Sequence, residues 1–306
     1  MTSLLTNSSA ITALQNLNAT NKTMQVTQDR ISTGMRVASA ADNAAYWSIA
    51  TTMKSDNAAL STVKDALGMG VATVDVTSSA MKSTTELISQ MKSKLVAAKA
   101  PGIDRAKVQA EISQLQSQLK SVADSSVFSG ENWISVNSGA TGYSATKSIV
   151  ASFTRSASSI TIGTIDVDVN KIKLFDSNGQ AGIIDKNRTL SGTTSSVFTM
   201  NISALTDSTT DKTTLTNYIS IVEGALTDVT TAASDLGAIK NRISMQQDFI
   251  ANLMDSVTKG IGQLIDADMS QESTKLQALQ VQQQLGVQSL SIANQNSQQI
   301  LSLFKG

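Results

Sequence analysis

The chain has 306 residues, which is enough for two or more domains at the usual size of about 100–200 residues each. Its 24 basic and 24 acidic residues leave no net charge, so the charge balance indicates neither a nucleic acid nor a membrane as partner. Cysteine and histidine are both absent, which excludes cysteine nucleophiles, imidazole bases, Cys/His zinc sites and disulfides. With 16% charged and 4% aromatic residues, the composition suits closely packed helices better than a catalytic pocket, and we expect neither an enzyme nor a cofactor.

The first 21 residues contain no charged side chain, and the first charge is that of Lys22. Apolar residues three and four positions apart predict a helix with one apolar stripe, in which a buried amide would fix the register of a helix pair. The stripe consists of Leu14, Leu17, Asn21, Met24, Gln28, Ile31 and Met35. Because the outer face of this helix is uncharged, we expect it to contact other helices and not bulk water.

Two further helices are predicted in the next stretch of the chain. The first has an apolar seam from Ile49 to Ala98 and ends at Pro101-Gly102, which contains the only proline of the chain. Asp104 is placed to cap the second helix, whose seam runs from Val108 to Val122.

The pattern changes between residues 137 and 207. Ile165, Val167 and Val169 alternate with polar residues and predict a strand, and the sequence 176–179 (Asp-Ser-Asn-Gly) is typical of a hairpin turn. A second short strand is predicted from Val197 to Ile202. This stretch, rich in Ser, Thr and Gly, predicts a β-rich insert.

Helical periodicity returns near Asp211 and continues to Ile261. Residues 276–304 then form a second stretch without charge, rich in Gln and Asn and again with one apolar stripe. We therefore predict a mainly α fold, a long antiparallel helical coiled-coil rod formed by the paired N- and C-terminal segments. The small β-rich insert lies in the middle of the sequence, and we expect it at the far end of the rod.

No Sec-type signal is visible near Met1, and no run of about 18 apolar residues predicts a membrane span. These observations predict a cytosolic protein unless another export route exists. The absence of cysteine fits both a cytosolic protein and an exported chain that stays unfolded in transit.

Two sequence motifs lie at opposite ends of the chain. The N-terminal motif is Arg30-Ile31-Ser32-Thr33-Gly34-Met35-Arg36-Val37, followed by Ser39-Ala40-Ala41-Asp42-Asn43-Ala44-Ala45. The C-terminal motif is Ile265-Asp266-Ala267-Asp268, followed by Ala293-Asn294-Gln295 and Gln299-Ile300-Leu301-Ser302-Leu303-Phe304. In this order and at these distances from the ends, the two motifs resemble those of bacterial flagellins, and the resemblance covers residues 1–135 and 208–306. The pattern of Tyr46-Trp47 with Ala41-Asp42-Asn43 is similar to flagellins of soil α-proteobacteria.

The resemblance implies a structural subunit that self-assembles into the extracellular filament of the bacterial flagellum used for swimming. It also implies export by the flagellar type III apparatus, with an export chaperone and a cap protein as partners and sister flagellins as further candidate partners. By the family's pattern, residues 1–45 with 260–306 form the inner tube, 46–136 with 208–259 the helical rod, and 137–207 the outer insert.

The charge-free helices and the two motifs supply the candidate polymerisation residues. For Arg30 and Arg36, intersubunit salt bridges and solvated contacts are equally good interpretations, and a helix-end or intersubunit contact fits Asp266 and Asp268 better than a cation site. The candidates are Leu14, Leu17, Met24, Ile31, Arg30, Arg36, Asp42, Asp266, Asp268, Leu276, Leu279, Leu290, Ile300 and Phe304.

The main alternative is the hook–filament junction protein, which shares the terminal helices and the export route. A coiled-coil adhesin or secreted effector would not polymerise on its own. A flagellin with a metallopeptidase insert is excluded, because that activity needs a His-Glu-x-x-His helix and the chain has no histidine.

Overall fold

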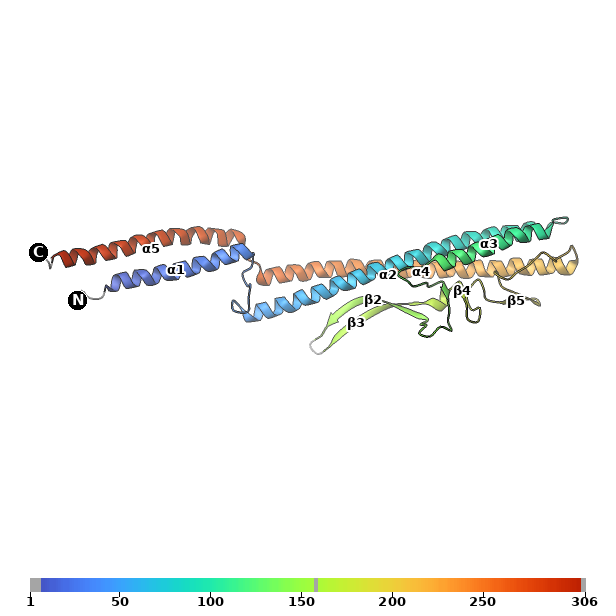
Figure 1. Cartoon of the computed structure of the whole chain (residues 1–306), viewed down its shortest axis with the longest axis horizontal. Coiled ribbons are helices and arrows are strands. Elements are labelled where there is room, and N and C mark those ends of the chain that lie inside the picture. The colour runs from blue at the N-terminus through green and yellow to red at the C-terminus, as the bar shows by residue number, and fades with distance from the viewer. Residues whose placement is uncertain (1–6, 157–158, 304–306) are drawn as a thin grey trace. The chain divides into compact units, whose positions relative to one another are not determined.

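The computed structural model describes residues 7–156 and 159–303, with side chains as far as residue 295. Five long helices dominate this part of the chain, and short strands lie between the third and the fourth (Figure 1). The helices are α1 (Ser8–Thr33), α2 (Ala44–Ala97), α3 (Arg105–Ser125), α4 (Thr209–Ile265) and α5 (Met269–Leu303). The strands are β1 (Ser135–Val136), β2 (Thr146–Arg155), β3 (Ile160–Asp168), β4 (Phe175–Asp176), β5 (Arg188–Leu190) and β6 (Thr193–Ser195), with a 3-10 turn, η1 (Val169–Lys171).

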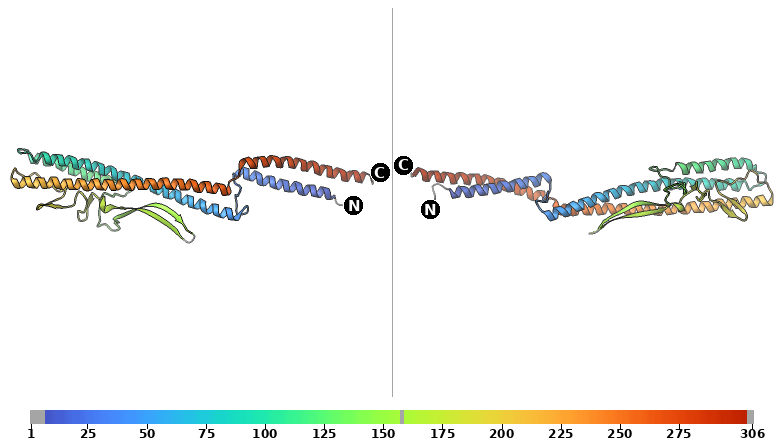
Figure 2. Two further views of the ribbon diagram at one scale, coloured as in Figure 1. Left: turned by 180° about the vertical axis from the view of Figure 1, so that it is seen from behind. Right: turned by 60° about the horizontal axis from the view of Figure 1, so that its bottom comes forward.

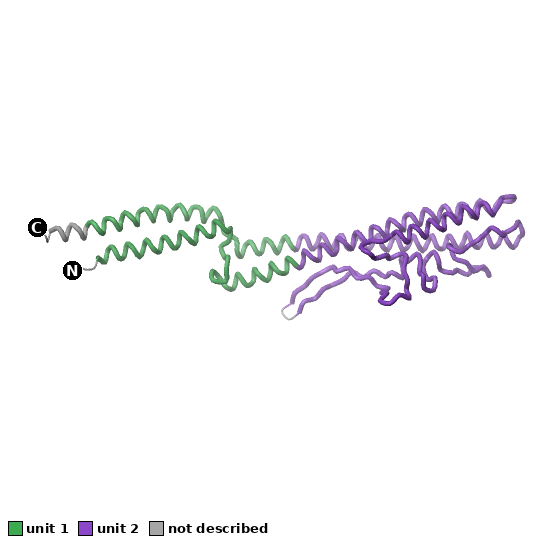
Figure 3. The backbone as a smooth tube through the Cα atoms, viewed as in Figure 1, with its two compact units in different colours: residues 1–58, 254–306 green, residues 59–253 purple. Residues whose placement is uncertain are grey.

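The chain divides into two compact units (Figure 3). Unit 1 contains residues 1–58 and 254–306, and unit 2 contains residues 59–253. The helices α2 and α4 contribute residues to both units, so each unit combines segments from the two halves of the chain. The mainly helical fold predicted from the sequence is confirmed.

In unit 2, α2 and α4 lie side by side and antiparallel, and α3 packs with them (Figures 1 and 2). Ion pairs between α2 and α4 join Asp75 to Lys240 at 2.5 Å and Lys92 to Glu223. Every seventh residue along the facing sides is fully or almost fully buried, as a heptad seam requires. The buried rows are Leu67, Val74, Met81, Ile88 and Leu95 on α2, and Leu215, Val222, Val229, Leu236, Ile243 and Ile250 on α4.

The break between α2 and α3 forms where the sequence predicts it. Gly102 has a φ of 79°, and the carboxylate of Asp104 accepts hydrogen bonds from the N–H groups of Ala106 (3.1 Å) and Lys107 (3.3 Å). The Asp104 side chain therefore satisfies two of the free donors at the start of α3.

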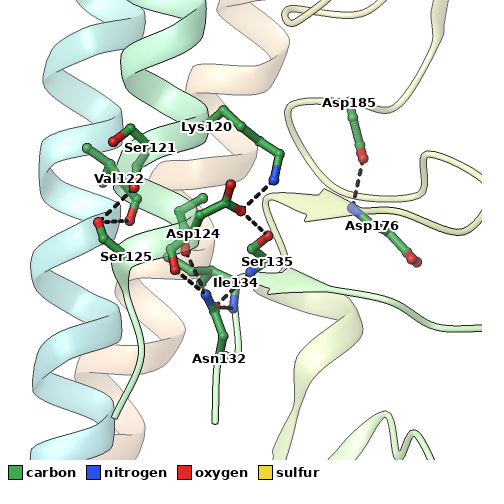
Figure 4. Close-up of polar contacts among 11 residues, drawn as sticks. Lys120, Ser121, Val122, Asp124, Ser125, Asn132, Ile134, Ser135, Asp176 and Asp185 are labelled. Atoms are coloured by element: carbon green, nitrogen blue, oxygen red, sulfur yellow. Dashed lines mark hydrogen bonds and ion pairs between the residues drawn. The ribbon is translucent and has the colours of Figure 1, made fainter. Parts of the chain in front are cut away.

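The end of α3 is tied to β1 by polar side chains (Figure 4). The Asn132 amide donates to the carbonyl oxygen of Ala123 at 2.7 Å and accepts from the N–H groups of Ile134 and Ser135. The Ser135 hydroxyl donates to Asp124 at 2.6 Å.

The β2–β3 hairpin lies along the helices of unit 2. The Ile149 side chain packs at the position where Gly70 of α2 lacks a Cβ, and the Gln246 amide of α4 donates to the carbonyl oxygen of Ala151 at 2.9 Å. The expectation that the insert sits at the far end of the rod is wrong. One face of the hairpin carries apolar residues, including the buried Ile165, and the side of the helices supplies the surface that buries them.

The segment from Val197 to Ile202 is a turn and not the predicted strand. The Gln116 amide of α3 donates to the carbonyl oxygens of Val197 (3.0 Å) and Met200 (3.1 Å), and the Ile202 N–H donates to Gln109 at 2.8 Å. Side-chain amides of α3 thus satisfy backbone groups that a strand would have paired with a neighbour.

The insert contains a buried charged cluster of Lys173, Asp176 and Asp185. The Lys173 ammonium lies 2.8 Å from Asp176. The Asp185 carboxylate accepts the N–H group of Asp176 at 2.7 Å (Figure 4) and that of Gly182, also at 2.7 Å. Burial opposes ionisation of Asp176, but the bonds from Lys173 and from the Ser138 and Asn178 N–H groups outweigh it and lower its pKa to about 2. Burial raises the pKa of Asp185.

Candidate functional site: the terminal helix pair and its joint

The terminal helices α1 and α5 lie side by side and antiparallel in unit 1 (Figures 1 and 2). Among the side chains that the structure describes, three polar contacts connect them. The Asn7 amide donates to the carbonyl oxygen of Ala293 at 2.9 Å, and the Gln283 amide donates to Asn21 at 2.7 Å. The guanidinium of Arg30 bonds to the carboxylate of Glu272 at 3.0 Å.

Little apolar surface is fully buried between these two helices. Thr27 is the buried residue of α1, and on α5, as far as residue 295, the buried residues are Glu272 and Leu279. Gly286 allows α5 to approach α1 closely, because a Cβ there would lie 3.2 Å from a methyl carbon of Leu17. Packing between α1 and α5 thus contributes much less than the heptad seam of unit 2.

The structure brings most of the predicted apolar candidates to this interface. Half-buried at the α1–α5 contact are Leu17, Met24, Ile31, Leu276 and Leu290, and Leu279 is buried. Leu14 is 47% exposed and Gln28 is exposed, so the predicted stripe is wrong at these two positions. The side chain of Ile300 and the whole of Phe304 lie outside the described residues.

A backbone joint connects the ends of the terminal pair to those parts of α2 (residues 44–58) and α4 (residues 254–265) that belong to unit 1. Gly34 ends α1 in the left-handed conformation, with a φ of 70°. Met35 then pairs with Asp266 in an antiparallel bridge, in which the Arg36 N–H donates to the carbonyl oxygen of Ile265 at 2.6 Å. The Ala267 N–H donates to the carbonyl oxygen of Gly34 at 2.9 Å, so the two sequence motifs meet in this joint.

The polar candidates in the motifs bond within the chain. Arg36 donates to the carbonyl oxygens of Leu264 (3.0 Å) and Gln263 (3.4 Å). Asp268 caps α5 by accepting the N–H groups of Ser270 (2.9 Å) and Gln271 (3.1 Å). Asp268 therefore makes a helix-end contact, which is one of the two contacts expected for it.

Asp42 forms a local turn after the joint. Its carboxylate accepts bonds from the Ser39 N–H (2.9 Å), the Ser39 hydroxyl (3.1 Å) and the Ala38 N–H (3.1 Å). These bonds, with a smaller contribution from the charge of Arg30, lower the pKa of Asp42. The carboxylate of Asp266 lies over Gly262, where a Cβ would approach it to 2.7 Å.

A small apolar cluster holds the joint. Its buried members are Val37, Ala50, Ile261 and Ile265. The half-buried residues packed against them are Met35, Met53, Val257 and Leu264. Sequence reasoning missed Ala50, because the predicted seam passes through Ile49, which is 49% exposed.

The outer side of α5 presents further apolar side chains. Val281 (55%), Leu285 (57%) and Ile292 (59%) are exposed, and helical spacing places them on one face, opposite the face that contacts α1. Ile11 and Leu14 are exposed on α1. The terminal pair thus exposes apolar surface on segments without charge.

Among the described residues, no three His, Cys, Asp or Glu side chains are grouped as a metal site would require. None of the described helices has the length and hydropathy needed to cross a membrane. The functional residues that sequence reasoning missed are Gln283 and Glu272. The signal for both was their position in the same three- and four-residue spacing as Leu276, Leu279 and Leu290.

Comparisons with known proteins agree with this geometry. The family model for the bacterial flagellin N-terminal helical region matches residues 4–139, and that for the C-terminal helical region matches residues 219–304. "Flagellin C" of Rhizobium meliloti is 49% identical over 322 residues, and a flagellin of Brucella melitensis is 42% identical over 307 residues. Both alignments cover 100% of this chain and of the relative, and "Flagellin A" of Rhizobium meliloti is 40% identical at the same coverage.

These relatives confirm the predicted similarity to flagellins of soil α-proteobacteria, and they give no better support to a hook–filament junction protein. Flagellins polymerise with themselves into the filament, are exported outward and act as structural proteins, not as enzymes. The chain therefore belongs to the bacterial flagellin family and is a structural subunit of the flagellar filament.

Proposed function

We propose that the terminal helix pair is the part of the chain that polymerises, and that the filament it builds is extracellular. The observation that carries this proposal is the apolar face of Val281, Leu285 and Ile292, which is more than half exposed on a helix without charge between residues 276 and 304. Burial of such a face against other copies removes apolar area from water, and no charged group has to be desolvated.

The candidate residues whose side chains the structure describes, all except Ile300 and Phe304, divide into three roles. The first role is to pair α1 with α5, and it belongs to the apolar candidates Leu17, Met24, Ile31, Leu276, Leu279 and Leu290. The charged candidates act indirectly, through the bonds and contacts they make within the chain. They are Arg30, Arg36, Asp42, Asp266 and Asp268. Leu14 is free to contact a neighbouring copy, as are the exposed residues of α5.

We propose the family's three-part arrangement for this chain. Residues 1–45 with 260–306 form the inner tube, 46–136 with 208–259 the helical rod, and 137–207 the outer insert. The two family models support it, because they leave residues 140–218 unmatched between them, and β2 to β6 fall in that interval.

The proposed partners are other copies of the chain, an export chaperone, a cap protein and sister flagellins. Support for sister flagellins comes from Rhizobium meliloti strain 1021, whose flagellins A, B, C and D are all similar to this chain over its whole length. A mixed filament is therefore part of the proposal.

The test is seeded polymerisation of the full chain carrying Leu285→Gln and Ile292→Gln. We expect the critical concentration for assembly to rise at least about tenfold, because each tenfold step corresponds to only about 1.4 kcal/mol of lost contact. Helix content measured by circular dichroism should stay unchanged, since both side chains are exposed. The matched control is Leu285→Met with Ile292→Met, which keeps the face apolar and should assemble normally. Assembly of the Gln variant at the parent concentration would contradict the proposal.

A further inference from the structure

The helix α5 carries apolar residues on two opposite faces. The inner stripe, which contacts α1, consists of Leu276, Leu279 and Leu290. The outer stripe consists of Val281, Leu285 and Ile292. Each stripe has three large aliphatic side chains, so the hydrophobic effect alone does not determine which stripe meets α1.

Polar side chains distinguish the two stripes. Gln283 lies within the inner stripe and donates to Asn21 of α1 at 2.7 Å. Glu272 lies at the start of the same face, has 9% of its side chain exposed, and bonds to Arg30 at 3.0 Å. The apolar contacts of the inner stripe are thus accompanied by a neutral and a charged polar contact.

The outer stripe offers no equivalent partners. A half-turn of α5 about its axis would place Val281 and Leu285 opposite Asn21, because residues two positions away lie on the far side of a helix. The same rotation would place Ser270 and Thr274 opposite Arg30. The amide would then face hydrocarbon and the guanidinium would lose its carboxylate, and each loss costs free energy.

We propose that the Asn21–Gln283 hydrogen bond and the Arg30–Glu272 ion pair are specificity determinants of assembly. They direct the inner stripe of α5 to the α1 of the same chain and leave the outer stripe for another copy. The second half of this statement rests on the proposed polymerising role of the terminal pair. Polar contacts in an apolar seam are well suited to this task, because they penalise wrong pairings more than they strengthen the right one.

The absence of cysteine from the chain allows a direct test with engineered disulfides. A Cβ at Gly286 would lie 3.9 Å from the Cβ of Leu17, which is within the range of about 3.5–4.5 Å for a disulfide. The pair Leu17→Cys with Gly286→Cys therefore reports the inner stripe against α1. The pair Leu17→Cys with Leu285→Cys reports the outer stripe, since Leu285 is exposed on the other side of α5.

The measured quantity is the ratio of the rates at which the two reporters form an intramolecular disulfide in the full chain. We expect the inner reporter to dominate in the parent, and the ratio to fall about tenfold when Asn21→Leu and Gln283→Leu are added. The matched control is Gln15→Leu with Gln280→Leu, which makes the same kind of change at exposed positions and should leave the ratio unchanged.

The Arg30–Glu272 ion pair is tested with the same ratio, and a variant in which the two charges are exchanged serves as the rescue. Arg30→Glu should lower the ratio, and Arg30→Glu with Glu272→Arg should restore it. An unchanged ratio both in the variant with Asn21→Leu and Gln283→Leu and in the Arg30→Glu variant would overturn the proposal and show that other contacts of the terminal pair orient α5. Because the ratio is measured in the monomer, it remains readable even if the chain fails to polymerise, so this proposal and the proposed function can fail separately.

Discussion

The helices of unit 2 and the terminal pair of unit 1 have similar apolar spacing but complete their cores to different extents. In unit 2, every seventh residue from Leu67 to Leu95 of α2 and from Leu215 to Ile250 of α4 is at most 1% exposed. In α1, a helix of 26 residues, Thr27 is the buried residue. A three- and four-residue apolar repeat therefore predicts a helix and its facing side, but not whether the chain itself supplies enough surface to bury that side.

The difference has a physical cause in the side chains between the seams. Unit 2 has ion pairs along α2 and α4, which suit an edge exposed to water. The charge-free stretches of the terminal helices, before Lys22 and after Lys275, have amides and small residues there, and apolar residues remain exposed on the outer side of α5. Ordering such a helix costs conformational entropy that its own burial offsets only in part, so contacts with other copies complete its stabilisation.

The largest expected effect compares the two regions directly. Ile88→Ala removes a fully buried side chain from the α2 seam and should lower the free energy of unfolding by about 2–5 kcal/mol. Leu14→Ala changes a side chain that is 47% exposed and should cost less than about 0.5 kcal/mol in the monomer. Denaturant unfolding of the monomeric full chain, followed by circular dichroism, measures both. Equal losses would remove the distinction between the two regions.

A smaller effect is expected in the insert of unit 2. A Cβ at Gly182 would lie 2.3 Å from the backbone oxygen of Leu174, so Gly182→Ala should destabilise unit 2 by about 1–3 kcal/mol. The control is Gly237→Ala in α4, where an added Cβ meets nothing within 4 Å and the better helix former should stabilise by about 0.5–1 kcal/mol. Thermal unfolding should shift in opposite directions for the two variants, and a shift in the same direction would refute this assignment of the two glycines.

The smallest expected effect is on the pH dependence of the stability of unit 2. The pKa of Asp176 falls from 3.8 to about 2 on folding, so its ionised form stabilises unit 2 above pH 4, and this contribution is lost as the pH falls towards 2. The pKa of Asp185 is raised on folding, so its protonation acts in the opposite direction. Urea unfolding between pH 5 and 2 should show a weaker acid dependence in Asp176→Asn and a stronger one in Asp185→Asn. An unchanged dependence in both variants would exclude the cluster as the source of acid sensitivity.

The seams of α2, α3 and α4 were predictable because buried side chains recur at helical spacing. The capping role of Asp104 was predictable because a helix cap is a bond between residues close together in the sequence. The joint was predictable as a motif but not as a structure. Arg36 and Asp268 bond to backbone atoms, and a sequence does not show which carbonyl or N–H group lies near a side chain.

The insert was the least predictable part. The strand β2 was missed, and the segment from Val197 to Ile202 was assigned to a strand although the amides of Gln116 and Gln109 satisfy its backbone. Such contacts come from a helix about 80 to 90 residues away in the chain, and local propensity contains no information on them.

The central claim is that the terminal pair, and not unit 2, drives assembly. Its most direct test is seeded polymerisation of the full chain beside a copy that lacks residues 1–30 and 276–306, followed by pelleting and electron microscopy. We predict that the full chain forms long filaments, and that the shortened copy stays in the supernatant with the unfolding transition of unit 2 preserved. Filaments formed by the shortened copy, or a full chain that stays monomeric on seeds, would contradict the account.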